Sequence, residues 1–209
     1  MKAIMKNLFI LIFFLQINTF CFAQILNDID GISPFQDDIA AVKKGNQWGF
    51  VNKKGELVIN YRDDLVVEKS SKNEVNIIDY PIFKDGRCLF KKMINDIFYY
   101  GYIDVTGKEI IPPQFLNATN FVDGYAIIIA PSNDIIGFNK ILKKDIVSSN
   151  IEEFVINISG ERVRYLENPI KYDSSKRKSK APPMFHSKFI GPHLVAVQKK
   201  DLKWDVYEF

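Results

Sequence analysis

The chain has 209 residues, 47% of them hydrophobic and 13% aromatic, and a formal net charge of +3 at pH 7. A chain of this length and composition folds around one sizeable core or as a short array of units. Its 28 Lys and Arg residues are nearly balanced by 25 Asp and Glu residues, which argues against a surface that binds nucleic acid mainly through charge.

The first segment, residues 1–23, has the pattern of a secretory signal peptide. Lys2 and Lys6 give it a basic start, residues 8–15 form an apolar run, and it ends on the small residue Ala23. The run is far shorter than the ~20 residues that a membrane-spanning helix needs. We therefore predict export through the Sec pathway to the periplasm, the cell surface or the medium, without a membrane-spanning segment.

Cleavage after Ala23 would make Gln24 the new N-terminus and would change the chemistry of the mature chain. It would remove two lysines and no acid, so the net charge would fall from +3 to +1. Cys21 would leave with the segment, and Cys88 alone could form no intramolecular disulfide. The bulky Phe20 before Cys21 argues against a lipoprotein, whose signal has a small residue there.

Two stretches of the chain are nearly the same, residues 47–59 (QWGFVNKKGELVI) and residues 100–111 (YGYIDVTGKEII). Each stretch begins its strand with an aromatic residue and a glycine, and large side chains then alternate with the residues between them. This alternation is the two-residue period of a strand. The matched positions are Trp48 and Tyr100, Gly49 and Gly101, and Gly55 and Gly107. This self-similarity predicts an internal structural repeat.

The segment in the middle of each stretch predicts a tight turn. Asn52 and Asp104 are each followed three residues later by a glycine, Gly55 and Gly107 respectively. That spacing suits a type I turn in which the glycine takes a positive φ. A second apolar run follows each glycine, so each stretch is predicted to be a β-hairpin.

A shared element precedes both hairpins and occurs a third time. It begins with Phe-x-Asp, continues in two of its three copies with Gly, and ends on a small residue, at residues 35–40, 83–88 and 121–126. An Asp-Gly pair such as Asp123-Gly124 is a turn signal. Cys88 holds the small position that Ala40 and Ala126 hold in the other copies, so we expect it to be buried.

These elements predict an all-β, mainly antiparallel fold of tandem hairpin units. The repeat domain spans residues 24–170, with units at about 35–61, 83–116 and 121–163. Residues 171–183 (KYDSSKRKSKAPP) are a basic linker or loop, which could also meet an anionic surface. Residues 184–209 return to the pattern, with Trp204 in the place of Trp48, and are a truncated terminal unit.

The register of the third unit stays open at this stage. Either residues 137–139 or residues 155–161 supply its aromatic-glycine strand. In the second case residues 132–150 are an insertion. Apolar residues there have a partly helical spacing, which predicts one short helix around residues 132–147.

The repeated pattern resembles the WG-repeat family of bacterial proteins, which is named for its Trp-Gly dipeptide. Residues 48–56 carry the motif best, and residues 101–109 carry it well, although Tyr100 replaces the Trp. The resemblance covers roughly residues 35–128 and implies a β-rich tandem array that acts as a binding or scaffolding module. It supplies no shared catalytic residues.

Motifs of catalysis or metal binding do not emerge from the sequence. His186 and His193 are the only histidines, and neither has the spacing of a metal site or a catalytic triad with other candidate residues. We therefore expect no cofactor, no metal and no enzymatic activity.

Aromatic side chains are the remaining candidates for a binding surface. They could stack on the faces of sugars or on a partner's side chains, or they could simply pack in the core. Besides Trp204, the candidates are Tyr99, Tyr125 and Tyr207.

The sequence as a whole predicts an exported, non-catalytic binding or scaffold module at the cell envelope. Its expected partner is another protein, and nucleic acid is not expected. The alternative is an aromatic-lined domain that binds carbohydrate, either a free glycan or the cell wall.

Overall fold

The structure is a computed structural model, and it describes residues 26–68, 79–171 and 181–209. Within these ranges the chain forms fifteen strands and no helix. The fold is all-β, as the sequence predicts. The predicted signal peptide and most of the predicted linker lie outside the described residues.

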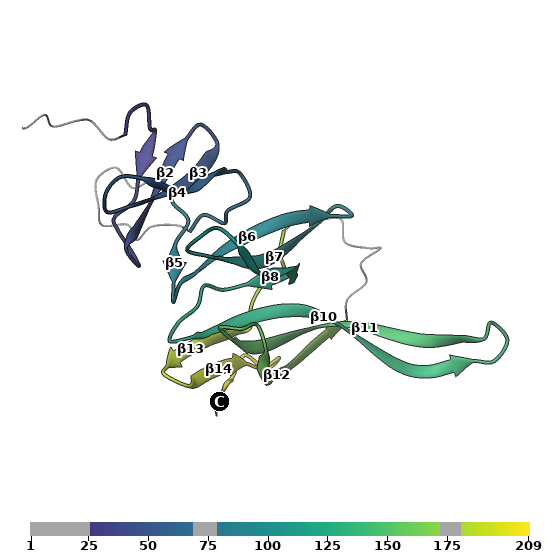
Figure 1. Cartoon of the computed structure of the whole chain (residues 1–209). Helices are drawn as coiled ribbons and strands as arrows, with labels where there is room; N and C mark the ends of the chain where they lie inside the picture. The colour runs from purple at the N-terminus through teal and green to yellow at the C-terminus, as the bar shows by residue number, and fades with distance from the viewer. Residues whose placement is uncertain (1–25, 69–78, 172–180) are drawn as a thin grey trace, which may run out of the picture.

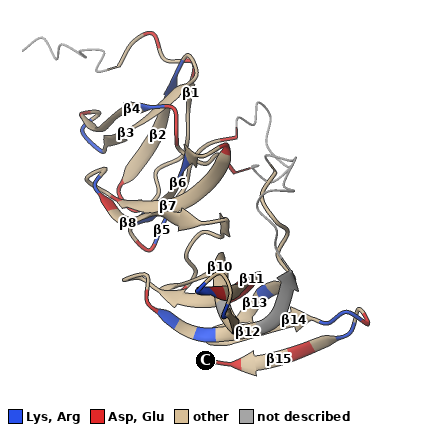
Figure 2. Ribbon diagram, turned by 90° about the vertical axis from the view of Figure 1, so that its right-hand side faces the viewer, with Lys and Arg blue, Asp and Glu red and all other residues tan. Residues whose placement is uncertain are grey.

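The strands form four antiparallel sheets that follow one another along the chain (Figure 1, and Figure 2 in a view turned by 90°). The first contains β1 (Gly31–Ile32), β2 (Ile39–Lys44), β3 (Gln47–Asn52) and β4 (Leu57–Arg62). The second contains β5 (Phe83–Lys84), β6 (Arg87–Ile94), β7 (Ile97–Asp104) and β8 (Glu109–Phe115). The third contains β9 (Asn117–Ala118), β10 (Tyr125–Asn139), β11 (Lys144–Asn157) and β12 (Arg162–Lys171). The fourth contains β13 (Ser187–Gly191), β14 (Leu194–Gln198) and β15 (Trp204–Glu208).

The pairing register places all four sheets on one common frame. The pair that opens the central hairpin of each sheet is, in chain order, Ile39–Asn52, Arg87–Asp104, Tyr125–Asn157 and Leu194–Glu208. Counting four residues back from the second member of each pair gives equivalent positions at Trp48, Tyr100, Glu153 and Trp204. The third unit is therefore in register through residues 155–161, and the alternative at residues 137–139 is wrong.

Consecutive sheets pack face to face, so the second and third sheets each pack one face on the sheet before and the other face on the sheet after. Because side chains alternate across a strand, the two faces carry different residues. The first core joins Trp48 and Phe50 to residues of the second sheet that include Cys88. Tyr100, Tyr102 and Ile111 then meet Ala126, Ile128 and Ile156 in the second core. The third core joins Ile127, Val155 and Leu166 to Val195 and Val197.

The Asn/Asp-x-x-Gly turns are tight turns of the predicted kind. Gly55, Gly107 and Gly160 have φ values of 79°, 83° and 85°. The side-chain oxygen of Asn52 accepts hydrogen bonds from the backbone N–H groups of residues 54 and 56, at 2.9 and 3.1 Å. Asp104 and Asn157 make the same pair of contacts in their own turns. One local interaction therefore builds all three turns.

These turns also touch the neighbouring sheet. A Cβ atom on Gly107 would lie 3.2 Å from Ile59 Cγ2, and one on Gly160 would lie 3.1 Å from Ile111 Cδ1. Ile59 and Ile111 hold equivalent positions, four residues after the turn glycines of their own units. Each following turn therefore packs its glycine on the third strand of the preceding unit.

A second set of turns reinforces the stack at the Asp-Gly elements. Asp37, Asp85 and Asp123 all adopt a positive φ, in which the chain reverses within two residues. The carboxylate of Asp37 accepts a hydrogen bond from Gly86 N–H at 3.2 Å, and that of Asp85 accepts one from Gly124 N–H at 2.8 Å. Asp37 and Asp85 thus each bind the turn of the next unit.

The glycines of the aromatic strands have a different role, which is to allow a close approach within one sheet. A Cβ atom on Gly49 would lie 2.9 Å from the backbone oxygen of Ile59. On Gly101 it would lie 2.5 Å from the backbone oxygen of Ile111. The pairing of β3 with β4, and of β7 with β8, shifts register at these glycines. In these two units a bulge in the third strand therefore excludes any side chain at the glycine.

The predicted helix around residues 132–147 is wrong, because β10 and β11 continue through this range as one long hairpin (Figure 1). Its apolar residues are split between the two strands, with Ile135 and Phe138 on β10 and Ile146 on β11. Their spacing along the chain therefore only imitates a helical period. Asn139 closes the turn, since its side-chain oxygen accepts hydrogen bonds from the N–H groups of Ile141 and Leu142, both at 3.0 Å.

Candidate binding surfaces

The outer face of the fourth sheet carries apolar side chains that are exposed, although the equivalent face of the first sheet is buried under the next sheet. Trp48 and Phe50 are 5% and 2% exposed on the corresponding face of the first sheet, where the second sheet covers them. Their equivalents in the fourth sheet, Trp204 and Val206, are 45% and 56% exposed. Among the described residues, no further sheet packs on this face.

A basic side chain lies over the exposed tryptophan. Lys188 lies on β13, opposite Ala196 of β14, and its Nζ lies 4.7 Å from the centre of the Trp204 ring. A lysine over an indole face is a cation–π contact. The face therefore combines an aromatic ring, an aliphatic side chain and a positive charge, which suits an amphipathic ligand. We call the surface formed by Lys188, Ala196, Trp204 and Val206 the terminal face.

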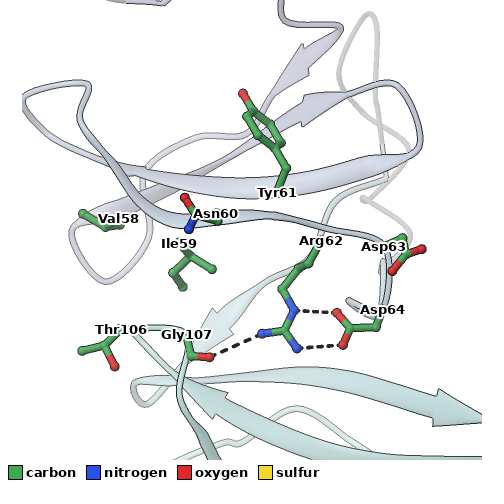
Figure 3. A pocket seen from close by; sticks show the side chains of 9 residues that line it. All are labelled: Val58, Ile59, Asn60, Tyr61, Arg62, Asp63, Asp64, Thr106 and Gly107. Atoms are coloured by element: carbon green, nitrogen blue, oxygen red, sulfur yellow. Dashed lines mark hydrogen bonds and ion pairs between the residues drawn. The ribbon is translucent and has the colours of Figure 1, made fainter.

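A second candidate is a groove of about 420 Å³ at the junction between the first two sheets (Figure 3). Residues 58–64 of β4 and its following loop form one wall, and Thr106 and Gly107 of the next turn form the other. The Arg62 guanidinium donates to both carboxylate oxygens of Asp64, on the same wall of the groove, at 2.5 and 2.7 Å. It also reaches the backbone oxygen of Gly107 at 3.4 Å.

The electrostatics of this groove favour a structural role for its arginine. The hydrogen bond to Asp64 raises the pKa of Arg62, against the opposing effect of burial. The guanidinium lies 5.3 Å from the centre of the Phe90 ring, so it is held on three sides. A guanidinium engaged in this way is a clamp between two sheets, and it has little capacity left for an anionic ligand.

Comparison with known protein families confirms the repeat that the register defines. The chain matches the family described as WG containing repeat over residues 28–48, 48–62 and 100–129. These segments include both aromatic-glycine strands and the turn at Gly107. The chain contains WG repeats. No curated protein matches the chain as a whole or in part.

The WG-repeat family match ends inside β10, and the structure shows why the third unit is hard to recognise. Glu153 replaces the aromatic residue of Trp48 and Tyr100, and Phe154 replaces the glycine. Phe154 fits because the register shift between β11 and β12 falls earlier, between Ile151 and Glu153, so that Phe154 pairs regularly with Tyr165. The WG signature is therefore lost where the bulge has moved.

Glu153 is the functional-looking residue that the sequence did not reveal. It is 3% exposed, and its carboxylate accepts hydrogen bonds from the backbone N–H of His186 at 2.7 Å and from the Ser187 hydroxyl. His186 Nδ1 also lies 3.2 Å from the same carboxylate. In a catalytic triad the imidazole lies between the acid and the hydroxyl, whereas here the carboxylate lies in the middle. The arrangement fastens β13 of the fourth sheet to β11 of the third.

The other aromatic candidates are partly buried in the WG-repeat array. Tyr99 packs beside the small cluster of Leu116, Ile129 and Ile151. Tyr125 lies 5.0 Å from Phe209 and 5.2 Å from His193, measured between ring centres. Tyr207 stacks under the guanidinium of Arg164 at 4.8 Å. Trp204 is therefore the candidate that presents the most free ring surface.

The chemistry of reactive groups is consistent with packing roles for the residues that the structure describes. Burial raises the pKa of the Cys88 thiol far above its usual range, so the thiolate is not populated near neutral pH. Cys88 is fully buried at the position equivalent to Ala40 and Ala126. Over the described ranges, no group of three His, Cys, Asp or Glu side chains is arranged to hold a metal ion. No helix in these ranges is long and apolar enough to span a membrane.

Proposed function

We propose that this WG-repeat protein is a non-catalytic binding module of the cell envelope that holds another protein on its terminal face. The observation that carries the proposal is the contrast between Trp48 and Trp204. The two residues hold equivalent positions, yet the first is 5% exposed under the next sheet and the second is 45% exposed. The surface that joins units inside the array is therefore available at the fourth sheet.

The chemistry of the terminal face supports a protein ligand. Tryptophan is among the residues that contribute most to protein–protein binding, because its large ring buries much surface at a small cost in conformational entropy. Val206 extends the apolar surface beside it, and Lys188 adds a charge that can select the partner. A β-rich segment would meet this face as each following sheet meets the one before it.

The location at the envelope rests on the signal-peptide pattern of residues 1–23. N-terminal sequencing of the protein recovered from its native cells tests it. We expect the recovered chain to begin at Gln24, and a chain that keeps its first residues and stays in the cytoplasm would contradict the envelope location.

The binding proposal is tested by affinity capture from the native envelope, with the captured proteins identified by mass spectrometry. Trp204→Ala should reduce the capture of a specific partner by about tenfold or more, since residues of this kind contribute about 2 kcal/mol or more to binding. Phe35→Ala is the matched control, because Phe35 is another large exposed aromatic residue, at 47%, in the connection between β1 and β2. Equal capture by both variants would place the interface elsewhere.

A carbohydrate ligand is the alternative that the exposed Trp204 ring specifically favours, because aromatic rings stack on sugar faces. A glycan array and a cell-wall pull-down separate the two. Saturable sugar binding that Trp204→Ala abolishes, without a captured protein, would support the alternative. Turnover in an activity screen that one carboxylate substitution abolishes, with the fold intact, would contradict the non-catalytic view.

A further inference from the structure

The third sheet carries a long projection that takes no part in the stack. Among the residues that the structure describes, β10 pairs with β9 only at Ile128 and Ile129, and β11 pairs with β12 only as far as Asn150. Residues 132–149 are therefore a two-stranded ribbon that extends beyond the other strands (Figure 1). We call residues 131–150 the arm and residues 135–147 its tip.

The tip is covered with apolar side chains that face solvent. Ile141, at the turn, is 93% exposed, and Leu142 beside it is 66% exposed. Exposed apolar residues are usually scattered singly, and a contiguous group marks a binding site for a protein or a membrane. The other exposed members of this group are Ile135, Ile136, Phe138, Ile146 and Val147.

These side chains occupy both faces of the ribbon. Val147 is opposite Ile135, and the next pair places Ile146 opposite Gly137. Because successive residues of a strand point to opposite faces, Val147 and Ile146 lie on different sides. A partner that covered one face, such as a second sheet, would leave the other face in water. A lipid interface surrounds an inserted tip and covers both.

Positive charge accompanies the apolar turn. Lys140, Lys143 and Lys144 flank Ile141 and Leu142, all of them exposed, and Asp145 is the acid nearest to them in sequence. Over residues 140–145 the formal charge is therefore +2, from three lysines and one aspartate. Exposed apolar residues at an apex with lysines around them are complementary to an anionic lipid surface.

We propose that the tip of the arm docks on a bilayer that contains anionic lipids. Ile141 and Leu142 enter the boundary between headgroups and acyl chains, and the three lysines contact the headgroups. The depth is limited by the backbone, because both outer edges of the two-stranded ribbon carry N–H and C=O groups that hydrocarbon cannot satisfy. The arm therefore anchors the protein at the membrane surface and leaves the array, with its terminal face, in water.

The first experiment places a reporter in the tip itself, because residues 8–15 are also apolar and would bind lipid wherever the full chain retains them. Leu142→Trp is made in the full chain with Trp48 and Trp204 retained. Its fluorescence is followed with vesicles of phosphatidylcholine alone and of phosphatidylcholine with a quarter phosphatidylglycerol. Met184→Trp is the matched control, since Met184 is 78% exposed outside the arm.

We expect the emission of Leu142→Trp to shift to shorter wavelength with the anionic vesicles, and brominated acyl chains to quench it. Met184→Trp should show neither change. An unchanged spectrum of Leu142→Trp, or equal changes in both variants, would overturn the proposal.

A second experiment measures the vesicle partition coefficient by co-sedimentation at low and high salt. Ile141→Asp with Leu142→Asp should lower it at least tenfold, whereas Met184→Asp with Leu202→Asp, which adds the same charge at other exposed apolar residues, should not. Lys140→Gln with Lys143→Gln should lower it roughly 25-fold, since each lysine contributes roughly fivefold near an anionic surface.

Analytical ultracentrifugation of the same variants measures self-association. A dimer that Ile141→Asp with Leu142→Asp disrupts, without vesicle binding by the unmodified chain, would overturn the proposal in favour of a second copy.

Discussion

The two kinds of glycine in the repeat act in different parts of the array. Gly49 and Gly101, on the aromatic strands, make room for a backbone oxygen of their own sheet. Gly107 and Gly160, in the turns, lie against an isoleucine of the preceding sheet. The first pair therefore shapes a unit, and the second pair joins one unit to another.

The third unit separates these two roles. It has Phe154 in place of the strand glycine, yet it keeps the turn at Gly160 and remains stacked on the second unit through Ile111. The Trp-Gly dipeptide that names the family is thus dispensable for stacking in this chain. The Gly turn is the element that the first two junctions share, since Gly107 lies against Ile59 and Gly160 against Ile111.

The largest expected effect tests the role of the strand glycine. Gly101→Ala should destabilise the protein by roughly 3 kcal/mol, because its Cβ would meet Ile111 O at 2.5 Å and the Phe90 ring and Pro112 C at 2.9 Å. Chemical denaturation measures the change. Gly137→Ala is the control, since its Cβ would meet nothing closer than 3.6 Å and should cost little. A similar small loss in both variants would remove the close-approach argument.

The next effect tests the link that replaces the aromatic residue in the third unit. Glu153→Ala should cost about 2 kcal/mol, because it leaves the buried Ser187 hydroxyl and the His186 N–H without their acceptor. Urea denaturation gives the loss in stability. Relative to the unmodified protein, backbone hydrogen exchange should become faster in β13, whereas exchange in β2 serves as the internal control. Unchanged exchange in β13 would mean that the fourth sheet is held without this carboxylate.

The turn glycines should give a smaller effect, and a matched set divides it into two parts. Gly107→Ala and Gly160→Ala should each cost about 1–2 kcal/mol, through the positive φ and the contact with the preceding isoleucine. Gly86→Ala should cost less, because it has a φ of 69° but open space at its Cβ. Thermal unfolding compares the three. Equal losses would show that the contact between sheets adds nothing to the strain.

The smallest effect concerns the turn carboxylate. Partial burial raises the pKa of Asp104, but hydrogen bonds from Thr106 and from the Lys108 backbone outweigh it, so the pKa is lowered in the folded state. Its contribution to stability is therefore complete above the ordinary value of 3.8 and is lost as the pH falls through the lower folded value.

Asp104→Asn should change the stability at pH 7 by less than about 0.5 kcal/mol, since Asn52 and Asn157 make the same turn and the site is screened by solvent. The variant should also lose less stability than the wild type between pH 5 and pH 2, by about the same small amount. Identical acid unfolding of both proteins would contradict the role given to the carboxylate.

Local patterns made much of this fold predictable. Alternation gave the strands, and the Asn/Asp-x-x-Gly spacing gave turns whose glycines do take a positive φ at Gly55 and Gly107. The small position of Cys88 was correctly expected to be buried. The turns follow from interactions within a few residues of one another, and the small position of Cys88 follows from the repeat; a single sequence displays both.

The features that escaped prediction depend on residues far apart in the chain. The helix expected around residues 132–147 is a ribbon, because cross-strand pairing leaves no clear trace in a count of spacings along the chain. The bond from Ser187 to Glu153 spans 34 residues and joins two sheets. The exposure of Trp204 was equally hidden, since its sequence matches a position that is buried in the first unit.

Trp48 and Trp204 hold equivalent positions, and comparing their accessibility tests the central claim most directly. That claim is that the face which packs on the next sheet in the first unit is open to solvent in the fourth sheet. Acrylamide quenching is measured on two single-tryptophan proteins, Trp204→Phe and Trp48→Phe, each in the otherwise complete chain. We expect the remaining Trp48 to be nearly inaccessible to the quencher and the remaining Trp204 to be several times more accessible. Equal quenching of the two tryptophans would contradict the stacked array and, with it, the terminal face as a binding surface.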